Sequence, residues 1–77
     1  MQIVFSGHAL LKLRQRNISQ GLVMETVRTP DFTKPSRHFR EERYKRFGKN
    51  YLKAVVVEER DILIVITAHW LAKGTKK

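Results

Sequence analysis

The residues best suited to chemistry are one histidine near the end of the chain and a basic run in its middle. His69 is a side chain type that can accept or release a proton near neutral pH. Residues 43–46 read Arg-Tyr-Lys-Arg and add three cations and a phenol. Metal-independent RNA cleavage needs a base for the 2′-hydroxyl, cations for the charge on phosphorus and an acid for the leaving oxygen. We therefore predict Arg43, His69 and Tyr44 as catalytic residues.

Basic residues are concentrated between positions 37 and 53, where seven cations stand against two carboxylates in a 77-residue chain of net charge +9. Arginine forms bidentate contacts with phosphate, and the aromatic residues interleaved here offer stacking faces for unpaired bases. A solvated edge strand protected by charge is the alternative interpretation. The residues that we expect to bind nucleic acid are Arg16, Arg37, Arg40, Lys45, Arg46 and Lys53, with His8 and Thr67 as additional candidates.

Each candidate also has a structural explanation. His69 can be the polar end of a strand, Tyr44 an aromatic partner across a sheet, and His8 a local hydrogen-bonding group. Arg16 near a helix C-terminus is favourable with the helix dipole on structural grounds alone. The three histidines have no metal-ligand spacing and the chain has no cysteine, so we expect neither a metal nor another cofactor.

The second half of the chain predicts a meander of three strands, at 37–47, 51–59 and 62–70. β-Branched and aromatic residues, which fit a pleated surface, dominate the last two segments. The intervening residues 48–50 and 60–61 are short enough to close antiparallel hairpins.

The first half predicts a strand at 2–5 and two serine-capped helices within 6–29, followed by a linker at 30–36. Residues 73–77 read as a frayed basic tail. The expected fold is a single α+β domain of order β-α-α-β-β-β. In it a helical hairpin packs on one face of a mostly antiparallel four-stranded sheet.

Two-residue loops in both hairpins would determine which side chains share a face. On that register, Arg43 and His69 lie on one open face, about 10 Å apart at the backbone across the small Ala54. The opposite face carries the bulkier apolar side chains and is expected under the helices, with Tyr44, Lys53, Val55, Val57, Ile64, Ile66 and Trp70.

The stretch His8–Ser19, HALLKLRQRNIS, resembles the opening of RelE/ParE-superfamily toxins, particularly BrnT-like proteins and their small relatives of unknown function. Glu42-Arg43 before a glycine, Val55–Arg60 and Ile66–His69 resemble the second half of that pattern. Thr67 and His69 depart from it, since serine and arginine often stand there. The resemblance implies a RelE-like fold and a ribonuclease toxin of a type II toxin-antitoxin system, neutralised by an antitoxin encoded beside it.

A non-catalytic nucleic-acid- or partner-binding module with the same fold is the alternative function, because a fold does not determine an activity. The expected partners are RNA and a cognate antitoxin, while ribosome association and homodimer formation stay open. No apolar run approaches the roughly 20 residues of a membrane-spanning helix, and the N-terminus does not resemble a signal peptide. We therefore expect no membrane partner and a cytoplasmic location.

Overall fold

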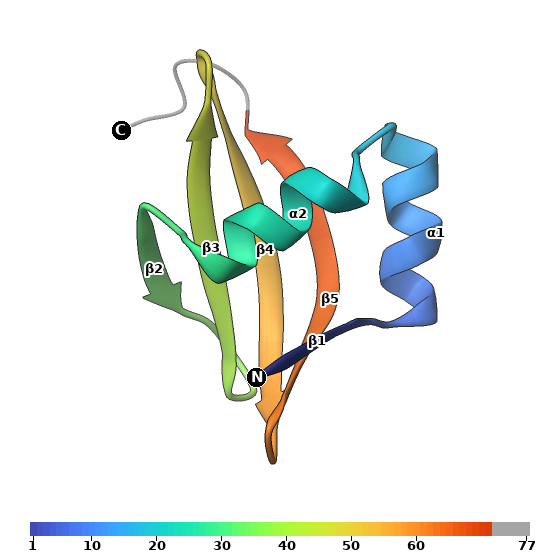
Figure 1. Cartoon of the computed structure of the whole chain (residues 1–77), viewed down its shortest axis with the longest axis vertical. Coiled ribbons are helices and arrows are strands. Elements are labelled where there is room, and N and C mark those ends of the chain that lie inside the picture. The colour runs from blue at the N-terminus through green and yellow to red at the C-terminus, as the bar shows by residue number, and fades with distance from the viewer. Residues whose placement is uncertain (72–77) are drawn as a thin grey trace.

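The computed structural model of the chain describes residues 1–71 and shows two helices on a five-stranded mixed sheet (Figure 1). The strand order is β1-β5-β4-β3-β2, with β1 parallel to β5 and the other neighbours antiparallel. The predicted basic tail lies outside the described residues. The elements are β1 (Gln2–Phe5), α1 (Gly7–Arg16), α2 (Gln20–Arg28), β2 (Phe32–Pro35), β3 (Arg40–Phe47), β4 (Asn50–Glu59) and β5 (Ile62–Leu71).

The predicted four-stranded, mostly antiparallel sheet is wrong, because part of the expected linker forms the edge strand β2. Phe32 pairs with Tyr44 of β3, and the pairing continues to Pro35. An edge strand accepts a proline because the missing N–H is not required by a second neighbour. The predicted strand 37–47 is also too long, since β3 begins only at Arg40, after a tight turn.

Local side-chain signals determine where the helices begin and end. The predicted N-caps Ser6 and Ser19 are confirmed, since each hydroxyl accepts a hydrogen bond from the backbone N–H three residues later. Asn17 ends α1 in the left-handed conformation, with φ 56°. Thr29 follows α2 and precedes Pro30, which disfavours further α-helix. Neither helix in the described residues is long and apolar enough to cross a membrane.

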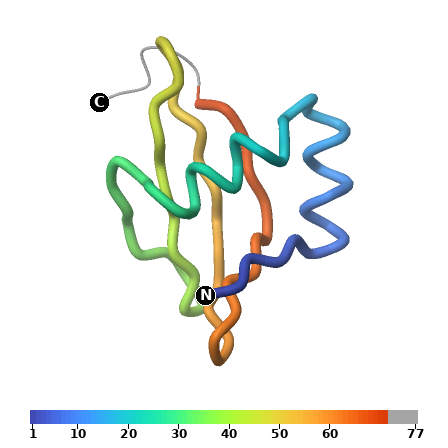
Figure 2. Tube along the Cα trace, viewed as in Figure 1, coloured from blue at the N-terminus to red at the C-terminus, as the bar shows by residue number. Residues whose placement is uncertain are grey.

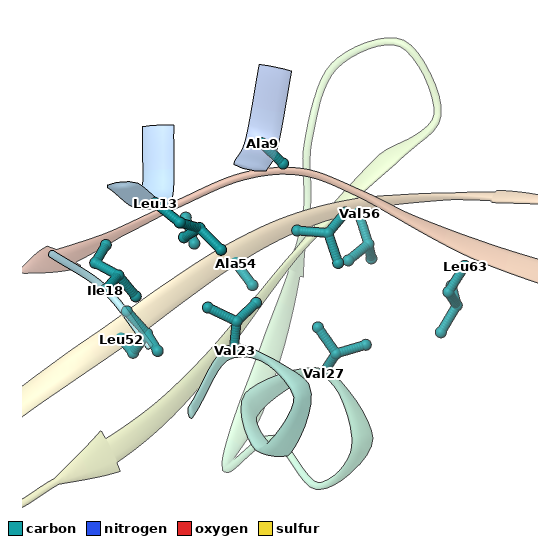
Figure 3. Close-up of a cluster of buried hydrophobic side chains, with 11 residues drawn as sticks. Ala9, Leu13, Ile18, Val23, Val27, Leu52, Ala54, Val56 and Leu63 are labelled. Carbon is teal, nitrogen blue, oxygen red and sulfur yellow. The ribbon is translucent and has the colours of Figure 1, made fainter. Parts of the chain in front are cut away.

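Both helices contribute to one core on a single face of the sheet. In Figure 2, α2 crosses in front of β3, β4 and β5, while α1 lies beside β5. Full burial of a valine or leucine contributes about 1.5–3 kcal/mol, so this layer is the main source of stability. The core side chains, most of them labelled in Figure 3, are Ala9, Leu13, Ile18, Val23, Val27, Leu52, Ala54, Val56, Leu63, Val65 and Ala68.

A β-bulge changes which residues of β5 share a face. Val55 pairs with Thr67, but the next residue, Val56, pairs with Val65, so Ile66 is the extra residue in β5. The side-chain alternation therefore changes phase at this point. Val65 faces the helices, whereas Thr67 lies on the opposite face.

The predicted assignment of the two faces is wrong for β3, for β4 and for Val65 in the first half of β5, and it is right for Thr67 and His69. The small and medium side chains Leu52, Ala54 and Val56 are buried under the helices. Their small volume, together with Ala68 on β5, allows α1 and α2 to approach the sheet closely. The bulkier set that includes Tyr44 and Lys53 lies on the face without helices, called here the open face.

Candidate functional site

Two rows of side chains cross the open face, because residues directly opposite each other in a sheet share a face. The first row holds Phe32, Tyr44, Lys53 and His69, and the second holds Lys34, Glu42, Val55 and Thr67. Each row takes one residue from each of β2, β3, β4 and β5. The polar residues near their centre, together with Arg16, form what we call the open-face cluster: Arg16, Glu42, Tyr44, Lys53, Thr67 and His69.

Glu42 organises the centre of this cluster. The Tyr44 hydroxyl donates a hydrogen bond to Glu42 Oε1 at 2.6 Å, and Lys53 Nζ lies 3.9 Å from Oε2. The hydrogen bond from Tyr44 is the main cause that lowers the pKa of Glu42, with further help from Lys53 and against the effect of burial. Glu42 is therefore ionised at neutral pH and holds Lys53 and Tyr44 in place.

Tyr44 is held on three sides. Its ring stacks on Phe32 with centroids 4.6 Å apart, and Lys34 Nζ lies 5.5 Å from the Tyr44 ring centroid. Burial, followed by the hydrogen bond and the charge of Glu42, raises the pKa of Tyr44 to about 12. The phenol therefore keeps its proton at neutral pH and directs it at Glu42. This arrangement favours a positioning role over the predicted catalytic one.

His69 is the group of the cluster whose ordinary pKa lies closest to neutral pH. It stands directly opposite Lys53 and is partly buried. Burial is the main cause that lowers the pKa of His69, and the positive charges of Lys53 and Arg16 lower it further. The negative charge of Glu42 acts in the opposite direction. His69 is therefore mainly neutral at pH 7, the form in which imidazole can act as a base.

Arg16 reaches the cluster from the end of α1. β1 pairs only with residues 62–65 of β5, so the later part of β5 presents backbone carbonyls at an edge. Arg16 Nη1 donates to the carbonyl of Ala68 at 2.9 Å and approaches the Thr67 hydroxyl at 3.3 Å. The guanidinium thus satisfies an edge carbonyl and places a cation near His69.

The predicted convergence of Arg43 and His69 on one phosphate is wrong, because the two residues lie on opposite faces of the sheet. Arg43 Nη1 donates to the carbonyl of Val27 at 2.6 Å, and Lys45 Nζ donates to that of Thr29 at 2.9 Å. Both cations therefore bind the C-terminal end of α2, where carbonyls and the helix dipole favour positive charge.

The other predicted basic residues surround the cluster without joining it. Arg40 and Arg46 lie near the two ends of β3, and Arg46 Nε donates to the Gly48 carbonyl at 2.8 Å. Arg37 is exposed in the turn before β3. His8 is exposed in the first turn of α1, on the helix layer and away from the open face.

Three contributors to the site, Glu42, Phe32 and Lys34, are not among the predicted site residues. Glu42 shares a face with Tyr44 because it lies two residues before it in a strand, and that spacing was a usable signal. Phe32 and Lys34 were missed because β2 was assigned to a linker. Their alternation with Thr33 between two prolines was the only signal, and it is weak.

No three histidine, aspartate or glutamate side chains within residues 1–71 come together as metal ligands. A family model described as a domain of unknown function (DUF4258) matches residues 5–70. That range includes both helices, β2, β3, β4 and every residue of the open-face cluster. No curated protein and no solved structure gives a significant match.

Proposed function

We propose that this chain, which belongs to the DUF4258 family of domains of unknown function, cleaves RNA without a metal ion. The ribose 2′-hydroxyl attacks the adjacent phosphorus and the phosphodiester bond breaks. One observation carries the proposal. A neutral histidine stands beside two cations, Lys53 and Arg16, on the sheet face opposite α1 and α2. A base next to preorganised positive charge is the arrangement that phosphodiester transfer requires.

The proposed reaction uses the polar groups of the cluster in sequence. His69 takes the proton of the 2′-hydroxyl, whose oxygen attacks the adjacent phosphorus. The positive charges of Lys53 and Arg16 stabilise the extra negative charge on the phosphoryl oxygens. As the bond from phosphorus to the 5′-oxygen breaks, the Lys53 ammonium gives a proton to that oxygen. The products are a 2′,3′-cyclic phosphate and a 5′-hydroxyl, and both side chains recover their protonation states from water.

Glu42 and Tyr44 support this reaction without touching RNA. Glu42 lies within ion-pair distance of Lys53, and Tyr44 holds Glu42 through the 2.6 Å hydrogen bond. The stack of Phe32 on Tyr44 keeps the phenol in its rotamer. A support of this kind keeps reacting groups within the narrow range of geometry that catalysis needs.

The resemblance of residues 8–19, 42–48 and 66–69 to BrnT-like proteins supports a biological role as a toxin held inactive by a neighbouring antitoxin. A chain of net charge +9 favours an acidic partner, and complementary charge would speed its association. Co-expression with the product of the adjacent reading frame tests this role. A stable complex and relief of growth inhibition are expected. Free protein that is harmless to cells would count against it.

Single-turnover cleavage of a labelled RNA tests the chemistry. His69→Ala should lower the rate by roughly 10²–10⁴, and Lys53→Met by roughly 10²–10³. Arg43→Met is the matched control, because it removes a cation from the opposite face and should leave the rate unchanged below its melting temperature. Cleavage of a substrate with 2′-deoxyribose at the scissile position would refute the mechanism.

Binding without cleavage by the wild-type protein would favour the alternative of a non-catalytic RNA-binding module. Affinity in that case should still fall with salt, by about 0.7 log unit per log unit of salt for each single-strand phosphate contact. The same titration, repeated with Lys53→Met, would show whether the open face provides those contacts.

A further inference from the structure

The turn between β2 and β3 displays an aromatic side chain to solvent. Phe39 is 98% exposed, the highest value among the large hydrophobic residues of the described chain. The turn is closed by a hydrogen bond from Arg40 N to the carbonyl of Arg37 at 3.1 Å and by one from Ser36 N to the carbonyl of Arg40 at 2.9 Å. Phe39 is thus held on an ordered turn and contributes nothing to the core.

The backbone of this turn is unusual for the residues that occupy it. His38 and Phe39 have φ values of 58° and 62°, both in the left-handed region. Glycine and asparagine suit that conformation, whereas a bulky side chain there is uncommon and costs backbone strain. Strained positions that hold a large exposed side chain point to a function for that side chain.

A cavity of about 840 Å³ lies beside Phe39, on the helix side of the sheet. Val56 and Leu63 contribute apolar surface, while Glu41 and Glu58 add two carboxylates. Arg40 also lines it, and Arg37 stands in the same turn. Figure 1 shows this turn at the same end of the sheet as the β4–β5 hairpin. The cavity thus combines an aromatic face, apolar surface, hydrogen-bonding groups and nearby cations.

We propose that this turn and cavity bind one unpaired nucleobase of a single-stranded RNA, an inference that rests on RNA being the substrate of the proposed function. The base stacks on Phe39, while Arg37 and Arg40 contact the flanking phosphates. The carboxylate of Glu58 accepts hydrogen bonds from the amino-bearing edge of the base. Arg37 and Arg40 flank the exposed Phe39 in the sequence of the turn, and their charge favours an RNA strand over an apolar peptide.

The cavity and the open-face cluster lie on opposite faces of the sheet, and a strand bound at both would pass from one face to the other at the turn between β2 and β3. Arg40 lies four residues before Tyr44 on β3, which is roughly 13 Å along a strand. A stacked strand with a phosphate every 3.4 Å spans that distance in about four nucleotides. The path to His69 is longer than this, because it also passes around the sheet to the open face, so the bound base would position a phosphodiester at least about four nucleotides away.

The experiment measures affinity for a fluorescent single-stranded RNA in a non-cleaving His69→Ala background. Adding Phe39→Ala should weaken binding roughly 5- to 150-fold, the range for loss of one base–aromatic stack. Phe39→Tyr should keep the affinity, because it keeps the ring. Leu11→Ala, which truncates an exposed apolar side chain on α1, is the matched control and should have no effect.

A series of RNAs, each with one abasic site at a different position, distinguishes loss of a base stack from a general effect of Phe39→Ala on RNA binding. At one position in the series, the abasic substitution should weaken binding by the same factor as Phe39→Ala. That position should then cause no further loss in the Phe39→Ala protein, because both changes remove the same contact. Additive losses at every position would overturn the subsite.

The two proposals fail separately. Binding that depends on Phe39, in a protein whose wild type never cleaves RNA, refutes the proposed chemistry and leaves this subsite standing. Cleavage at the normal rate, with an RNA affinity that Phe39→Ala does not change, refutes the subsite alone. The subsite is also refuted if Phe39→Ala weakens binding to a protein partner but not to RNA. Absence of any RNA binding overturns both.

Discussion

Replacement of Arg43 should reduce stability and leave catalysis intact. Arg43→Met keeps most of the aliphatic stem and removes the guanidinium, which donates to the Val27 carbonyl at 2.6 Å and to Glu41 Oε1 at 2.6 Å. The first contact joins β3 to the C-terminal end of α2. Its loss leaves a helix-end carbonyl without its charged donor.

The magnitude follows from these two contacts. A hydrogen bond from a charged group contributes about 1.5–3 kcal/mol, and a cation at a helix C-terminus adds about 0.3–1 kcal/mol. The Arg43 side chain is 21% exposed, so solvent screening reduces these values moderately, and the Glu41 pair at 41% exposure adds little. We expect a loss of about 2–3 kcal/mol in the free energy of unfolding. In a domain of this size that lowers the melting temperature by about 10–20 °C.

Thermal and urea unfolding followed by circular dichroism measure the effect, and single-turnover RNA cleavage well below the melting temperature measures activity. Lys49→Met is the control, because it removes the same charge from an exposed position in the β3–β4 turn. It should leave the melting temperature nearly unchanged. An Arg43→Met protein that melts like the wild type but no longer cleaves RNA would refute this reasoning and restore Arg43 as a catalytic residue.

The pKa shifts and one helix end give the remaining predictions. Because burial and the nearby cations lower the pKa of His69 below 6.5, the cleavage rate should rise with pH and pass half of its plateau below pH 6.5. Lys53→Met should move the His69 titration, followed by NMR, to higher pH, and an unchanged midpoint would contradict the assigned cause. The pKa of Tyr44 is raised from 10.0 to about 12, so its contribution to stability is complete below pH 10 and is lost as the pH rises toward 12. Denaturation midpoints should show that loss in the wild type but not in Tyr44→Phe. Asn17→Val should cost about 1–2 kcal/mol in thermal unfolding because of its left-handed φ, whereas Asn17→Gly should not.

Signals that act within a few residues could be read from the sequence. Ser6, Ser19 and Asn17 bond to backbone groups three or four positions away, so the ends of the helices follow from local chemistry. The short hairpin loops 48–49 and 60–61 likewise depend on chain proximity alone. The basic character of the middle segment needs no structure at all.

Long-range pairing decided the rest of the fold. β2 is the four-residue segment Phe-Thr-Lys-Pro, whose side chains are all exposed, and it forms a strand because it pairs with the edge of β3 and Phe32 stacks on Tyr44. The bulge between Val55 and Val56 adds one residue to β5, which period-two alternation cannot reveal. Because of that extra residue, Thr67 and His69 lie on the open face although alternation would place them on the same face as Val65, which faces the core.

The same distinction applies to the site. The sequence identified His69, Tyr44, Lys53, Arg16 and Thr67 as residues of suitable chemistry, but residue type carries no information about distance. The tertiary structure brings the end of α1 to β5, so Arg16 donates a hydrogen bond to the carbonyl of Ala68, which lies 52 residues later in the chain. It also turns Arg43 toward α2, where helix carbonyls bind it. Packing between elements decides which cations contact a neighbouring helix or strand and which remain near His69. Only the folded chain determines that packing.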